Sequence, residues 1–181
     1  MATTTSTSDK RVLTGLFRDR DSAERAYQSI TDRGYGRDDV NLVMSDETRQ
    51  RHFSGTTADG RQTELGSKAA EGAGIGGAIG GSLGAIAAAI AAVGTTIALP
   101  GLGLVIAGPL AAAIAGAGAG AATGGIVGAL IGWGIPEERV KQYDQGIREG
   151  GILMAVRPRS DEDATFLEDS WRSNRGEHVY R

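Results

Sequence analysis

The sequence predicts an α+β fold: a ferredoxin-like split βαβ sandwich that is interrupted by an inserted all-α hairpin of glycine-zipper helices. Two observations support this prediction. All 41 charged residues lie outside residues 72–136, and none occurs among the 65 residues of that stretch. On both sides of it the chain repeats one order of apolar strand, polar turn, amphipathic helix and strand. The chain therefore joins two charged segments to one long segment without charge.

The charge pattern divides the chain into five segments. In order, they are a disordered tail (1–10), the first βαβ half of the sandwich (11–45), a polar linker (46–71), the glycine- and alanine-rich hairpin (72–135), and the second half with one additional helix (136–181). The tail is rich in Thr and Ser and has no apolar stretch, so no secretory signal is expected in it. We expect the two polar halves to build one domain.

The first half has clear boundaries. Residues 12–17 are apolar and end at a charged turn, which predicts a strand. Asp21 or Ser22 is the expected cap of a helix that continues to about Gly34. Residues 40–44 are again apolar and predict the second strand.

The second half repeats the same order. Residues 152–156 match the first strand, residues 163–172 predict a helix, and residues 178–180 predict a short final strand. An additional helix is expected over residues 136–148, because it starts with proline and has glutamates at the positive end of its dipole.

Two such units predict a four-stranded sheet with helices on one face, joined by right-handed crossovers. Tyr27, Phe166 and Trp171 are the large apolar side chains that we expect in its core. His52 lies in the polar linker, where a solvated side chain is expected.

The insertion contains 19 Gly and 19 Ala, and small residues recur in it at every fourth position. The glycines of the first row are Gly72, Gly76, Gly80 and Gly84. Those of the second row, which follows a break at residues 99–103, are Gly108, Gly116, Gly120, Gly124, Gly128 and Gly132. Positions four apart share a helix face, so each row predicts a groove where another helix approaches closely. Each interior glycine costs about 1 kcal/mol relative to alanine, so these helices need packing partners or lipid.

An apolar row accompanies the first glycine row. Its members are Ile75, Ile79, Leu83, Ile86, Ile90, Val93 and Ile97. A helix over residues 73–98 is roughly 39 Å long, enough for a bilayer core that needs about 20 residues. Between Ala111 and Gly125, however, Ile114 is the single large apolar residue, and the tip has no charged or aromatic anchor. The sequence thus favours an oligomer of hairpins with the glycine rows inside and the apolar rows outward or lining a cavity.

Composition argues against several functional classes. The chain has no Cys and two His, which excludes disulfide frameworks and thiolate sites and disfavours a His-rich metal site. A net charge of −3 argues against nucleic acid as a partner. The Gly-x-Gly-x-x-Gly match at Gly72, Gly74 and Gly77 follows no strand and has no acidic residue about twenty positions later, so a dinucleotide site is rejected.

Acidic residues at helix starts are the remaining candidates for chemistry. Asp19 and Asp21 precede the first helix, and residues 161–163 hold the equivalent place in the second unit. Together with Arg18 and Arg20, Asp19 and Asp21 could bind a cation or a phosphate, but charged turn residues and a helix cap are the favoured interpretation for both groups. No acid–base or nucleophile constellation is recognised, and the sequence predicts no enzyme, no cofactor and no metal.

Several short segments resemble a known family. Residues 12–17, 22–26 and 43–48 look like the N-terminal domain of the bacterial heat-induced general stress proteins, the YflT-like group. The glycine zipper followed by residues 150–153 is similar to their longer relatives, which are induced by low temperature or stress and described as membrane proteins. The resemblance implies a stress-induced, non-enzymatic bacterial protein and supplies no catalytic residues.

Three functions follow as expectations. The first is a non-enzymatic stress-response protein that forms a homo-oligomer and associates through its hairpin with the bacterial inner membrane, with the polar domain in the cytoplasm. The second is an oligomeric scaffold or conduit that carries an apolar molecule, such as a quinone or lipid, for a partner enzyme. The third is a ligand-sensing regulatory module built on the sheet. A soluble cytoplasmic oligomer is the alternative to the membrane location, and a partner protein is unidentified.

Overall fold

The computed structural model describes two continuous polar regions and several short pieces of the insertion. The described residues are 12–53, 86, 96–99, 103–109, 111, 127–128, 130–131 and 134–181. The predicted tail at 1–10, most of the polar linker and most of the insertion lie outside these residues. The fold of the described part is α+β, as predicted.

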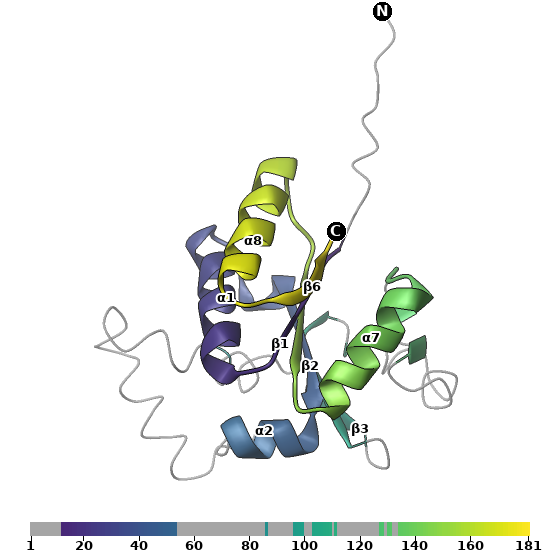
Figure 1. Cartoon of the computed structure of the whole chain (residues 1–181). Helices are drawn as coiled ribbons and strands as arrows, with labels where there is room; N and C mark the ends of the chain where they lie inside the picture. The colour runs from purple at the N-terminus through teal and green to yellow at the C-terminus, as the bar shows by residue number, and fades with distance from the viewer. Residues whose placement is uncertain are drawn as a thin grey trace, which may run out of the picture.

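One antiparallel sheet of six strands organises the structure (Figure 1). The strands are β1 (Leu13–Phe17), β2 (Val40–Ser45), β3 (Thr96–Leu99), β4 (Leu104–Ala107), β5 (Ile152–Val156) and β6 (Glu177–Tyr180). Their order across the sheet is β3-β4-β2-β5-β1-β6. The four strands predicted from the polar halves are confirmed, whereas the predicted sheet size is wrong because the insertion adds β3 and β4.

Four α-helices and one 3-10 turn lie wholly within the described residues. They are α1 (Arg20–Asp32), the 3-10 turn (Arg37–Asp39), α2 (Asp46–His52), α7 (Glu137–Arg148) and α8 (Asp161–Ser173). Helices α1 and α8 lie side by side on one face of the sheet, and α7 crosses the opposite face (Figure 1). The helices of the two predicted βαβ units thus share one face, and the additional helix α7 covers the other. The predicted polar linker also begins as a helix, α2.

Local side-chain chemistry sets the helix boundaries. The Asp19 carboxylate accepts a hydrogen bond from the Ser22 N–H at 2.8 Å, so Asp19 is the N-cap of α1, two residues before the predicted Asp21. Ser160 Oγ accepts from the Asp163 N–H at 3.1 Å and caps α8 in the same way. Helix α1 ends where Gly34 adopts a φ of +76°, a conformation that glycine tolerates best.

The sheet separates two apolar cores. Every residue of β1 and β5 is buried, as expected for strands that are covered on both faces. The first core lies under α1 and α8 and contains Tyr27 and Trp171, as predicted. The second core lies under α7. Phe166 does not join either core: it is 41% exposed, and the Arg33 guanidinium lies 4.2 Å from its ring centroid.

Candidate functional site

The insertion is the feature that the polar halves do not explain, and the structure ties it to the sheet through two strands. Strand β4 pairs antiparallel with β2, from Ser45 opposite Leu104 to Leu42 opposite Ala107, and β3 pairs with β4. The predicted helical hairpin is therefore wrong over residues 96–99 and 104–107. Residue Ile97, placed by the sequence on a helical apolar face, belongs to a strand.

Gly103, at the end of the predicted tip of the hairpin, contacts the polar domain. Gly103 has a φ of +62°, and its carbonyl oxygen accepts a hydrogen bond from the Asp46 N–H at 2.6 Å. This contact places Gly103 beside the start of α2. Whether the hairpin crosses a membrane stays a prediction.

Gly108 serves close backbone approach. Its φ is +105°, and an added Cβ would lie 2.3 Å from the Val40 carbonyl oxygen and 3.0 Å from Asn41 Oδ1. The place of Gly108 in a helical small-residue row is therefore wrong: only a residue without a side chain fits beside β2 here. Gly128, by contrast, is helical and exposed, with open space where a Cβ would be.

The other members of the two glycine rows and of the apolar face lie outside the described residues. These are Gly72, Gly76, Gly80, Gly84, Gly116, Gly120, Gly124, Gly132, Ile75, Ile79, Leu83, Ile90 and Val93. Their predicted roles in helix packing stay predictions.

Ile86 is the exception, and it contacts α1. Its side chain is fully buried and belongs to the core under α1 and α8. Its backbone N–H donates a hydrogen bond to Glu24 Oε2 at 3.1 Å, and Glu24 is itself only 1% exposed. In this structure Ile86 packs into the sheet domain, whereas the sequence places it on an apolar row that faces outward or lines a cavity. No sequence signal distinguished Glu24 from the other charged residues of α1.

Arg20, one turn before Glu24 on α1, contacts the chain at His52 and Phe53, just before residues 54–85 begin. Its Nη1 donates to the His52 carbonyl oxygen at 2.8 Å, and its guanidinium lies 5.2 Å from the centroid of the buried Phe53 ring. Arg20 Nε lies 3.6 Å from Glu24 Oε1. We call these five residues the α1 clasp: Arg20, Glu24, His52, Phe53 and Ile86.

The far end of the insertion enters the second core. Ala111 and Leu130 are fully buried there, and Ile135 is almost so. They pack in one cluster with Val140 and Tyr143 of α7. The described pieces of the insertion are therefore shared between both faces of the sheet.

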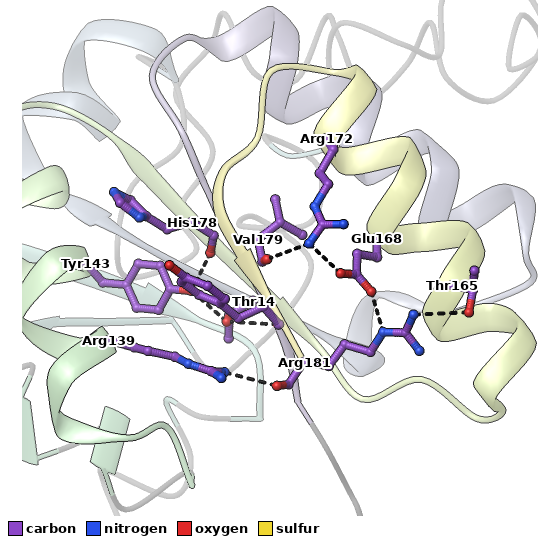
Figure 2. A network of polar contacts seen from close by, with 10 residues as sticks. Thr14, Arg139, Tyr143, Thr165, Glu168, Arg172, His178, Val179 and Arg181 are labelled. Carbon is purple, nitrogen blue, oxygen red and sulfur yellow. Dashed lines mark hydrogen bonds and ion pairs between the residues drawn. The ribbon is translucent and has the colours of Figure 1, made fainter.

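A polar network closes the opposite edge of the sheet (Figure 2). The Tyr143 hydroxyl donates to the His178 carbonyl oxygen at 2.7 Å and lies 2.7 Å from Thr14 Oγ1. Burial raises the pKa of Tyr143 to about 12. The phenol therefore stays neutral and fixes β6 against α7.

The same network holds the last residue of the chain. The Arg181 carbonyl oxygen accepts from Arg139 Nη1 at 3.0 Å, and its side chain contacts Glu168 and Thr165 (Figure 2). Glu168 also pairs with Arg172 at 2.6 Å. The polar groups of this network hydrogen-bond or pair with one another, so we interpret the network as stabilising the position of β6.

The acidic residues at helix starts are used as caps and ion-pair partners. Asp19 caps α1, and Asp163 accepts a hydrogen bond from the Tyr35 hydroxyl at 2.8 Å and faces Arg33 at 3.5 Å. Within the described ranges, no group of three or more His, Asp or Glu side chains is arranged to hold a metal ion. In the same ranges no helix combines the length and apolarity that a membrane crossing needs.

Comparison with protein-family models, with curated proteins and with solved structures finds no match in any of the three. The resemblance to the YflT-like stress proteins therefore stays a prediction.

Proposed function

We propose that the protein is a non-enzymatic stress-response protein that self-associates, and that associates with membrane lipid, through its charge-free insertion. The two polar halves form the sheet domain from which this insertion extends, and the insertion adds strands β3 and β4 to its sheet. The observation that carries the proposal is the 65-residue stretch without a charge, with 19 Gly and 19 Ala, joined to a domain that is highly charged everywhere else.

The base is proposed to be a ferredoxin-like split βαβ domain. In support, the four strands of the polar halves follow the order β2-β5-β1-β6, all antiparallel. Helix α1 lies between β1 and β2 in the chain, α8 lies between β5 and β6, and the two helices contact each other on one face. The extra strands β3 and β4 continue this sheet beyond β2.

The insertion contacts the sheet domain at its middle, through β3 and β4, as well as where it joins the polar halves. Strands β3 and β4 return the middle of the insertion to the sheet, which divides it into two arms, residues 72–95 and 108–135. Small residues at every fourth position recur in both arms, and such rows allow close helix packing. We propose that the arms of several copies pack together and that the assembly lies against lipid.

Replacing Gly120 and Gly124 together by Leu tests the proposal. Two bulky side chains in the second glycine row block close approach, so the oligomer mass measured by light scattering should fall. The matched control places Leu at Gly118 and Ala122, which occupy the same stretch but a different face of the predicted helix. Equal masses for wild type and both variants would contradict packing through this row.

Membrane association is tested by fractionating cells that express the full chain and washing the membranes with carbonate. We expect the protein in the washed pellet. Recovery of a discrete soluble oligomer would overturn the membrane part of the proposal and leave self-association standing. Organic extraction of that oligomer would then show whether it carries a stoichiometric quinone or lipid, as the conduit alternative requires.

A further inference from the structure

We propose that the α1 clasp is an autoinhibitory contact: it keeps Ile86 in the core of the sheet domain and thereby restrains the insertion from self-association and lipid contact. The inference rests on the proposed function. Its structural basis is that one pair of side chains on α1, Arg20 and Glu24, contacts the chain at both ends of residues 54–85.

The outgoing end is held by Arg20. Its guanidinium donates to the His52 carbonyl oxygen, which is the last carbonyl of α2, and lies near the ring of Phe53, which is 2% exposed. A cation near the C-terminus of a helix and over an aromatic ring is favourable on both counts. The chain therefore leaves the sheet domain from a fixed point beside α1.

The returning end is held by Glu24. A carboxylate that is almost completely buried accepts the backbone N–H of Ile86, and the neighbouring Arg20 lies close enough to balance part of its charge. Hydrogen bonds to an ionised acceptor are stronger than neutral ones, and breaking one inside a protein leaves a costly buried group. A backbone contact also fixes the position of the chain whatever the side chain at residue 86.

Competition for Ile86 connects the clasp to assembly. The sequence places Ile86 in the apolar row that accompanies the first glycine row, while the structure buries the same side chain among residues of the sheet domain. One side chain cannot occupy both environments at once. Any assembly that uses the complete apolar row must therefore first undo the Glu24–Ile86 contact, and loss of that contact should favour assembly.

The test compares Glu24→Gln with wild type and with Glu47→Gln. Glu47 is an exposed residue of α2 that pairs with Arg51, so its neutralisation removes the same charge without touching the clasp. Hydrogen exchange of the Ile86 amide reports the contact directly. Light scattering and flotation with vesicles of phosphatidylethanolamine and phosphatidylglycerol report assembly and lipid contact. All variants are measured as the full chain.

We expect Glu24→Gln to speed exchange at Ile86 by about tenfold or more and to raise oligomer mass or vesicle binding, with Glu47→Gln unchanged in both. Unchanged exchange at Ile86 would overturn the clasp. Faster exchange without any gain in assembly would overturn its inhibitory role. The proposed function is judged separately: it fails if neither wild type nor variant associates with itself or with vesicles.

Arg20→Gln provides a second variant in case Glu24→Gln does not fold, which loss of the near-ultraviolet signal of the buried Trp171 would reveal. It weakens the same clasp from the His52 side and should give the same two changes in smaller degree. Wild-type behaviour in both measurements for this folded variant would also contradict the proposal.

Discussion

Two buried tyrosines on opposite faces of the sheet allow a controlled test of the structure. Tyr143 is fully buried, and its hydroxyl bridges α7 to the His178 carbonyl and to Thr14. Tyr27 is 2% exposed, and its hydroxyl has no hydrogen-bond partner in the part of the chain that the structure describes. Tyr143→Phe therefore removes a hydrogen-bonded hydroxyl, whereas Tyr27→Phe removes a buried hydroxyl that has no partner among the described residues.

The magnitude follows from what each change leaves behind. In Tyr143→Phe the Thr14 hydroxyl can turn to the Tyr180 carbonyl oxygen, which lies 3.4 Å away, but the His178 carbonyl loses its donor. One buried acceptor without a partner costs about 1–3 kcal/mol of unfolding free energy. In Tyr27→Phe an unpaired hydroxyl leaves the core, so stability is unchanged or rises by up to about 1 kcal/mol.

Urea denaturation followed by far-ultraviolet circular dichroism measures both variants, with wild type alongside. For a loss of about 2 kcal/mol in a chain of this size we also expect the melting temperature of Tyr143→Phe to fall by about 4–8 °C. Equal destabilisation by the two substitutions would refute the reasoning, because it would mean that the bridge from Tyr143 to β6 contributes nothing.

Three further outcomes are expected. The pKa of Tyr143 is raised to about 12 in the folded protein, so its contribution to stability is complete below pH 10 and is lost as the pH rises towards 12. The unfolding free energy should therefore fall less steeply with alkaline pH in Tyr143→Phe than in wild type. Gly108→Ala should lower the unfolding free energy by about 2 kcal/mol or more, because Gly108 has a positive φ and lies against the β2 backbone. Gly128→Ala should leave the unfolding free energy unchanged or raise it by up to about 1 kcal/mol, because Gly128 is helical and has open space where a Cβ would be. The reverse order of stability in chemical denaturation would contradict the packing of β4 on β2. Trp171→Ala should cost about 3–5 kcal/mol and Phe166→Ala less than about 1 kcal/mol, and similar losses in thermal melts would show that Phe166 is a core residue after all.

The elements of the polar halves could be predicted because their signals are local. A short continuous apolar run marks strand β5, and capping residues such as Ser160 begin a helix by binding an N–H three positions later. The observed cap of α1, Asp19, lies two or three residues before the predicted cap, Asp21 or Ser22. Phe166 was misplaced because a helix can carry an aromatic residue at its margin, where Arg33 covers it.

The candidate site could not be predicted, because long-range contacts decide it. Residues 104–107 and the small-residue register around them are compatible with a helix by spacing alone. Strand β2, however, presents unpaired N–H and C=O groups on the side away from β5, and the apolar run at 104–107 satisfies them as β4. Gly108 then fits because it has no side chain to meet the Val40 carbonyl.

The sequence by itself determined where strands and helices form in residues 12–45 and 137–180, and that a charge-free glycine- and alanine-rich segment separates them. Both properties depend on neighbours within a few positions. Only the tertiary structure decided that α7 covers the second face, that the insertion completes the sheet, and that Glu24 holds Ile86 across 62 positions of the chain. Backbone N–H and C=O groups bond to partners that are close in space, and apolar surfaces are buried against one another in the same way. Separation along the chain does not limit which residues meet.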